Sequence, residues 1–201
     1  MGKLFILMGK SASGKDTIYE QLLKRNCLGL QAVVPYTTRP IRSGEIPGET
    51  YHFCSAEEAE AMRQAGRIIE LRTYQTVHGP WSYFTADDGQ IDLKNNSYLL
   101  IGTLESYLRF REYFGARAVI PLYIFVEDGA RLQRALDRER RQREPKYEEM
   151  CRRFLADQED FSEEKLAEAG IRKTFENLEL ERTAASLQEY MERVLAQTEE
   201  S

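Results

Sequence analysis

The chain has 201 residues, of which 42% are hydrophobic and 30% are charged. This length suits one domain with insertions, and the composition argues against a fibrous or wholly disordered chain. The net charge of −5 makes a general nucleic-acid binder a poor candidate.

Signals of membrane, secreted and metal-binding proteins are weak in this sequence. The longest apolar stretch near the start, Leu4–Met8, is far shorter than a membrane span or a secretory leader requires. The three cysteines are widely separated and fit neither a disulfide framework nor a zinc site, and two histidines are too few for a multi-histidine metal site. We therefore expect a cytoplasmic protein without a membrane or nucleic-acid partner, present as a monomer or a homodimer.

Apolar runs typical of buried strands alternate along the chain with segments of helical spacing. In chain order, the expected strands are Leu4–Met8, Gln31–Val34, Tyr98–Gly102, Ala118–Val126 and Lys173–Asn177. The expected helices are Asp16–Arg25, Ala56–Ala65, Leu104–Phe114, Ala130–Arg143, Lys146–Glu168 and Ala184–Gln197. Pro121 lies inside the fourth strand and predicts irregular pairing there. The alternation predicts an α/β fold with a parallel sheet and helices on both faces.

Residues 37–88 break this alternation. They contain turn residues such as Gly44, Pro47 and Gly48, short segments of β-type composition and a single clear helix. We interpret this region as an inserted subdomain over the end of the sheet. The core of a single domain then comprises residues 1–36 and 89–201.

A glycine-rich segment, Gly9–Asp16, joins the first strand to the first helix. Its two glycines, Gly9 and Gly14, allow backbone N–H groups to surround a phosphate, and the helix adds its positive end. Lys15 directly follows Gly14 and can reach the β- and γ-phosphates. An ordinary strand-to-helix turn rich in Gly and Ser is the alternative. The spacing favours a phosphate-binding loop, so the residues expected to bind ATP are Gly9, Lys10, Ser11, Ala12, Ser13, Gly14, Lys15, Asp16 and Thr17.

Asp16 stands where this motif normally has a Ser or Thr that helps to hold Mg²⁺. A carboxylate is itself a good Mg²⁺ ligand, because this ion prefers oxygen. The alternative is a helix N-terminal acid that the helix dipole stabilises. Thr17 points about 100° away from Asp16 around the helix, so its hydroxyl does not directly take the place of the usual Ser or Thr hydroxyl. Both interpretations of Asp16 stay open, and Mg²⁺ with ATP is the expected cofactor.

A second group of polar residues lies in the inserted region. Arg39 and Arg42 are three residues apart, and Tyr51 follows nine residues later. Two guanidinium groups and a phenol can clamp a second phosphate. A solvated basic loop is the alternative interpretation.

Together these segments resemble the guanylate kinase family, whose members combine an N-terminal phosphate loop with a Thr-Thr-Arg-Pro-x-Arg-x-Gly-Glu segment, a Gly and Tyr-x-Phe. The resemblance covers most of the chain and weakens after Glu70. It implies a three-layer P-loop NTPase fold with an acceptor-binding subdomain and a helical lid at about residues 138–148. The matching residues are Thr37, Thr38, Arg39, Pro40, Arg42, Gly44, Glu45, Gly48, Tyr51 and Phe53.

The resemblance also implies roles for individual residues. Besides Lys15, the arginines that would act on the transferring phosphoryl group are Arg134, Arg138 and Arg153. Glu70 would accept hydrogen bonds from a guanine edge, and Asn177 falls near the segment that contacts the donor base. The residues that would contact the acceptor phosphate, or lie near those that do, are Arg39, Arg42, Tyr51, His78 and Gly79.

Three positions depart from the family's pattern. Thr103 stands where an acid normally helps to read guanine, Pro35 replaces a serine of the acceptor site, and Pro80 replaces a hydroxyl residue. A buried guanine N–H without its acceptor costs about 1–3 kcal/mol, so lower guanine selectivity is expected. Thr103 stays a candidate acceptor-binding residue.

The expected function is that of a kinase that transfers the γ-phosphoryl group of Mg·ATP to a nucleoside monophosphate, with GMP favoured. Two alternatives stay open. One is a ribose 1,5-bisphosphate phosphokinase, whose phosphate loop the Lys15-Asp16 pair resembles. The other is a non-catalytic guanylate-kinase-like binding module, against which the complete phosphate loop argues.

Overall fold

The computed structural model describes residues 1–42, 44–76 and 79–199. Its main sheet has five strands in the order β2-β7-β1-β8-β9, and all neighbouring strands are parallel. Because β1 is in the middle of this order, the segment that follows it lies at the centre of the sheet's carboxyl edge. The strands are β1 (Leu4–Gly9), β2 (Gln31–Ala32), β7 (Tyr98–Ile101), β8 (Val119–Phe125) and β9 (Thr174–Glu176).

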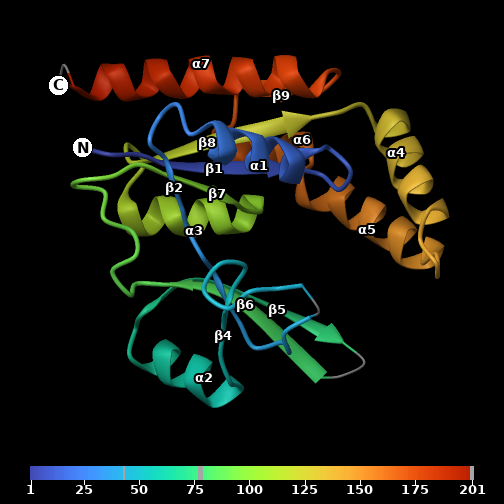
Figure 1. Cartoon of the computed structure of the whole chain (residues 1–201), viewed down its shortest axis with the longest axis horizontal. Coiled ribbons are helices and arrows are strands. Elements are labelled where there is room, and N and C mark those ends of the chain that lie inside the picture. Colours follow the sequence, from blue (N-terminus) through green and yellow to red (C-terminus); the bar gives the residue numbers. More distant parts are fainter. Residues whose placement is uncertain (43, 77–78, 200–201) are drawn as a thin grey trace.

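Helices cover both faces of this sheet (Figure 1). Successive side chains of a strand point to opposite faces, so the residues of β1 enter two separate apolar clusters. Its even-numbered residues pack with α3 (Leu104–Phe114), whereas Phe5 and Leu7 pack with α1 (Lys15–Arg25) and α7 (Leu180–Glu199). The predicted three-layer α/β architecture is confirmed.

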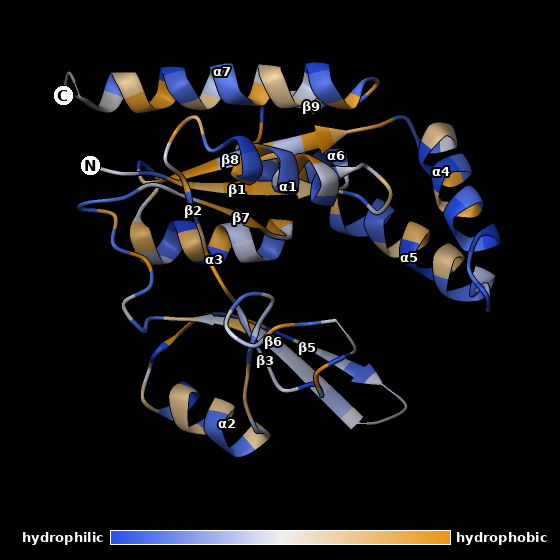
Figure 2. Cartoon of the chain, in the orientation of Figure 1, coloured by the Kyte–Doolittle hydropathy of each residue, from blue (hydrophilic) through white to orange (hydrophobic). Residues whose placement is uncertain are grey.

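The remaining core helices are α4 (Asp128–Arg140), α5 (Tyr147–Asp160) and α6 (Glu163–Glu168). The first two pack against each other at one end of the sheet and consist mostly of hydrophilic residues (Figure 2). The expected lid, residues 138–148, corresponds to the end of α4, the connection and the start of α5. Nowhere in the described part of the chain is a helix both long and apolar enough to cross a membrane.

Four strands form a second sheet in the order β4-β3-β6-β5, with α2 (Ala56–Gln64) beside it. In Figure 1 this unit lies below α3, at a distance from the centre of the main sheet. The expected boundary at Thr37 falls inside β3, because Tyr36 already pairs with His52 and Phe84 of this sheet. The strands are β3 (Tyr36–Thr37), β4 (His52–Phe53), β5 (Ile68–Thr76) and β6 (Gly79–Ala86).

The antiparallel hairpin of β5 and β6 is much longer than the short strand-like segments expected in this region. Its strands carry many polar residues, so the apolar pattern that reveals a buried strand is weak here. A bulge between Ile68 and Glu70 sets the register, after which Glu70 pairs with Thr85 and Arg72 pairs with Tyr83. Glu70 and Arg72 are two residues apart and therefore share one face of β5.

Two further expectations about the core were wrong. Pro121 pairs with Ile6 in a continuous register, because β9 pairs with β8 only from Tyr123 onward and no strand needs an N–H on the other side of the proline. The expected helix Lys146–Glu168 is two helices, since the side chain of Ser162 caps the start of α6.

Candidate active site

The glycine-rich segment after β1 forms a tight loop that leads into α1. Gly14 is the last residue before the helix and has a φ of +83°, a conformation that strains residues with a side chain. A Cβ atom at Gly14 would also lie 2.6 Å from Asn177 Nδ2, and one at Gly9 would lie 2.7 Å from Ser13 Oγ. This close packing explains both glycines, and it places the N-terminal amides of α1 at the carboxyl edge of the sheet.

Side chains from three other elements support this loop. Asn177 Nδ2 donates to the carbonyl of Ser13 at 2.8 Å, and the fully buried Arg131 donates to the carbonyl of Ser11 at 3.1 Å. The N–H of Ser11 donates to Asp157 Oδ2 at 2.7 Å. The loop is therefore held by α4, by α5 and by the segment after β9. Sequence reasoning assigned no such role to Arg131 or Asp157.

Two residues expected to bind ATP have other partners in this structure. Lys10 Nζ donates to Gln158 of α5 and lies 3.8 Å from Asp128 Oδ1 of α4, so its charge is directed to these two helices. Asn177 is 3% exposed and its amide supports the loop. Contact of either side chain with ATP stays a prediction.

A cavity of about 750 Å³ lies between the start of α1 and the second sheet. Lys15 and Asp16 line it from α1, Arg153 lines it from α5, and Tyr51 and Glu70 line it from the inserted region. Lys15 Nζ lies 3.4 Å from Asp16 Oδ2. The cavity thus brings together the lysine of the phosphate loop, one of the three expected arginines and two of the expected acceptor residues.

Arg39 is 4% exposed and forms a bidentate ion pair with Glu45. Its Nη1 donates to Glu45 Oε2 at 2.7 Å, its Nη2 donates to the other carboxylate oxygen, and its Cζ lies 5.0 Å from the ring centre of Tyr51. The backbone N–H of Arg42 also donates to Glu45 Oε2, at 2.8 Å. Of the three residues expected to clamp the acceptor phosphate, Tyr51 alone lines the cavity, and phosphate binding by the two arginines stays a prediction.

The pair of Arg39 and Glu45 makes the stability of the protein depend on pH. The Arg39 guanidinium holds the pKa of Glu45 at about 2, below its ordinary value of 4.5. A lowered pKa in the folded state stabilises the protein above the ordinary value, and this stabilisation is lost as the pH falls through about 2. Arg39→Met is therefore expected to lower the Tm by several degrees at pH 7, by a difference that shrinks towards pH 2. Thermal unfolding followed by circular dichroism at several pH values measures this difference.

Arg63→Met is the matched control for this experiment. Arg63 and Glu60 form an ion pair at 2.7 Å on α2, but the two side chains are 59% and 46% exposed. Exposed pairs contribute little to stability, so this change is expected to leave the Tm nearly unaltered. Equal losses from the two substitutions would contradict the structural role assigned to Arg39.

Glu70 is a buried carboxylate on the wall of the cavity, with 4% of its surface exposed. Its Oε1 accepts from Thr85 Oγ1 and its Oε2 accepts from Arg72 Nε, each at 3.1 Å. Burial raises the pKa of Glu70, and the positive charge of Arg72 opposes this shift. When ionised, each oxygen keeps a lone pair for an N–H donor of a ligand. Arg72 also lines the cavity, and the only sequence signal for it was its spacing of two residues from Glu70.

Known proteins match this chain in sequence and in fold. Residues 1–83 match the family model described as guanylate kinase. A guanylate kinase of Rhodopirellula baltica is 33% identical over 135 residues, which cover 64% of this chain and 60% of that protein. One of Neisseria gonorrhoeae is 40% identical over 88 residues, which cover 44% of this chain and 40% of that protein. Over these stretches the chain is similar to guanylate kinases.

The crystal structure of guanylate kinase from Anaplasma phagocytophilum shares the fold of this chain. The two superpose with a TM-score of 0.64 at 23% sequence identity, over 96% of this chain and 85% of that chain. The sequence matches cover less than this structural match. The chain spans 60% and 40% of the two bacterial relatives named above.

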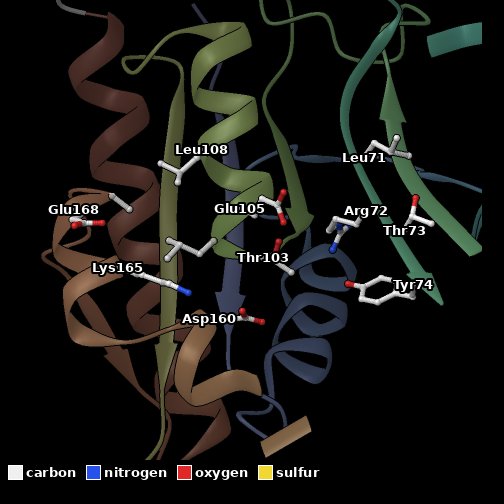
Figure 3. A pocket seen from close by; sticks show the side chains of 12 residues that line it. Leu71, Arg72, Thr73, Tyr74, Thr103, Glu105, Leu108, Asp160, Lys165 and Glu168 are labelled. Carbon is white, nitrogen blue, oxygen red and sulfur yellow. The ribbon is translucent and has the colours of Figure 1, made fainter. Parts of the chain in front are cut away.

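Thr103, which replaces an acid usual in the guanylate kinase family, caps α3. Its Oγ1 accepts from the N–H of Ser106 at 3.2 Å, and Ser106 Oγ donates to the carbonyl of Thr103 at 3.0 Å. Thr103 lines a neighbouring cavity of about 640 Å³ instead of the cavity that contains Glu70 (Figure 3). Its hydroxyl therefore serves the helix, and contact with the acceptor stays a prediction.

Gly79, another expected acceptor residue, lies where the β5–β6 hairpin closes. It pairs with Thr76 and does not line either cavity. His78 lies outside the described residues. Contact of either residue with the acceptor stays a prediction.

The three arginines expected to act on the phosphoryl group are in different surroundings. Arg153 lines the main cavity. Arg134 Nη2 donates to the carbonyl of Asn177 at 2.9 Å, and Arg138 Nε lies 4.0 Å from Glu139 Oε1 with half of its side chain exposed. The structure thus brings Arg153 to Lys15 and leaves the other two on α4, outside the cavity.

The residues at the phosphate loop fit a Mg²⁺ ion that arrives with a nucleotide. Asp16 lines the cavity beside Lys15 with 72% of its side chain exposed, whereas Thr17 is exposed and does not line it. Across residues 1–42, 44–76 and 79–199, no three His, Cys, Asp or Glu side chains gather into a metal site. Mg²⁺ commonly binds one or two carboxylates together with water and substrate phosphates, and Asp16 can supply such a carboxylate.

Proposed function

We propose that this protein transfers the γ-phosphoryl group of Mg·ATP to a nucleoside monophosphate, with GMP as the favoured acceptor. One observation carries the proposal. A single cavity is lined at one end by Lys15 of a complete phosphate loop and at the other by Tyr51 and the buried carboxylate of Glu70. A donor phosphate and an acceptor nucleotide can therefore meet in it. Similarity to guanylate kinases over part of the chain supports the same activity.

Phosphoryl transfer requires positioning and positive charge more than it requires a side-chain nucleophile. Lys15 and the amides of the phosphate loop would hold the β- and γ-phosphates, and Arg153 would stabilise the charge that develops on the transferring group. Tyr51 and Glu70 would orient the acceptor. The acceptor's phosphate oxygen is already nucleophilic, so no general base is needed. Bound Mg²⁺ would neutralise phosphate charge, and Asp16 would hold it.

The proposal is tested by ADP release from Mg·ATP with a panel of acceptors. The panel contains GMP, dGMP, AMP, CMP, UMP and ribose 1,5-bisphosphate, and a reaction without acceptor measures ATP hydrolysis. We expect kcat/KM for GMP to exceed that for the other ribonucleotides by about tenfold or more. Tenfold better turnover of ribose 1,5-bisphosphate would replace the proposed acceptor. ATP binding without transfer to any acceptor would favour a binding module.

A further inference from the structure

The wall of the cavity around Glu70 carries a second charged group, Arg72. Arg72 Nε lies 3.1 Å from Glu70 Oε2, so the carboxylate and the guanidinium are direct neighbours on one face of β5. Within the described part of the chain, the two terminal nitrogens of Arg72 have no hydrogen-bond partner. They are therefore available to a ligand.

Arg72 lies between two cavities and lines both of them. It lines the 750 Å³ cavity together with Glu70, and it also lines the neighbouring 640 Å³ cavity together with Thr103 and Glu105. Figure 3 shows its side chain pointing from β5 towards the start of α3, where Thr103 and Glu105 lie. Its side chain is 22% exposed, so the guanidinium is only partly solvated.

Besides Lys15 and Arg153, the other side-chain donors on the wall of this cavity are uncharged hydroxyls, among them those of Tyr51, Tyr74 and Tyr83. Pro35, Leu100 and Ile101 line the same cavity and have no polar side-chain atom. The hydroxyls of Thr85 and Ser106 donate within the protein, to Glu70 and to the carbonyl of Thr103. A base that donates to Glu70 therefore has Arg72 as the nearest charged donor for an adjacent acceptor atom.

We infer that Arg72 determines acceptor specificity by donating to the 6-oxo group of a purine whose neighbouring N–H groups donate to Glu70. A carboxylate beside a guanidinium presents acceptors next to donors, and the edge of guanine presents N1–H and N2–H groups next to O6. Arg donates well to guanine O6 because its planar fork offers two N–H groups at once. This inference rests on the proposed function, and it names a residue that can supply the hydrogen-bond donor missing at Pro35.

The test compares GMP with 6-thioguanosine monophosphate, which keeps both N–H donors but has sulfur, a weak acceptor, in place of O6. The wild type is expected to prefer GMP by roughly tenfold or more in kcat/KM. Arg72→Met is expected to lower this ratio to about one, and Arg72→Lys, which keeps a donor, to retain part of it. The ratio of GMP to IMP, which differ only in the 2-amino group, is expected to stay unchanged in Arg72→Met.

Arg67→Met is the matched control, since Arg67 is exposed in the same subdomain and its Nε donates only to the carbonyl of Asp87. An unchanged ratio of GMP to 6-thioguanosine monophosphate in Arg72→Met would overturn the inference. Equilibrium binding of the two nucleotides without ATP separates this result from failure of the proposed function. A wild type that binds GMP with the expected preference but transfers no phosphate overturns the function alone. A wild type that neither binds nor phosphorylates GMP overturns both.

Discussion

Lys15→Ala is expected to lower kcat by a factor on the order of 10³, with a smaller effect on the KM for the acceptor. Lys15 is the one lysine that follows the second glycine of the loop and lines the cavity. Its ammonium group would lie against the β- and γ-phosphates, where negative charge is greatest during transfer. Rates measured by coupled ADP release at saturating GMP give this factor.

Lys24→Ala controls for the loss of a positive charge from α1. Lys24 is in the last turn of the same helix and is exposed. It is far along the helix from the phosphate loop, so its removal is expected to change kcat by less than about twofold. A Lys15→Ala enzyme that keeps a tenth or more of wild-type kcat would contradict the role of the loop in catalysis.

Arg153→Ala is expected to lower kcat by a factor on the order of 10³, because an arginine placed on the transferring phosphoryl group has an effect of that size or larger in related chemistry. Arg153 lines the cavity with Lys15 and Asp16. It makes no hydrogen bond or ion pair with the described residues, so its guanidinium is available to phosphate. Arg153→Lys is expected to recover part of the rate. The lysine ammonium keeps the positive charge but lacks the planar, bidentate N–H groups of the guanidinium.

The adjacent residue provides the matched control for this change. Arg152 Nε and Nη2 each donate to Glu149 at 2.7 Å along α5, and the side chain is 65% exposed. Arg152→Ala removes the same charge from the same helix, but we expect it to leave kcat within about twofold of the wild type. Equal losses of kcat in the two variants would show that the rate depends on the total positive charge of α5. They would contradict a specific role for Arg153 in phosphoryl transfer.

The phosphate loop could be predicted because it depends on a short stretch of chain. Gly9, Gly14 and Lys15 belong to one strand-to-helix turn, in which Gly14 has a positive φ that favours glycine. The parallel sheet was predictable for a similar reason, since its buried strands are continuous apolar runs.

The residues that sequence reasoning missed depend on contacts between distant segments. Asp157 and Arg131 reach Ser11 only because α4 and α5 fold back against the loop. Arg72 reaches the cavity only because the register of a long, polar hairpin turns its face towards α3. No local pattern in the sequence encodes these pairings.

Phosphoryl transfer from ATP to GMP is tested most directly by ³¹P NMR of the enzyme with Mg·ATP and GMP. If the cavity joins a donor site to an acceptor site, the γ resonance of ATP decreases to an equilibrium level while ADP and GDP appear in equal amounts, with no inorganic phosphate. Inorganic phosphate formed without GDP, or an unchanged spectrum from an enzyme that binds ATP, would contradict phosphoryl transfer between the two ends of the cavity.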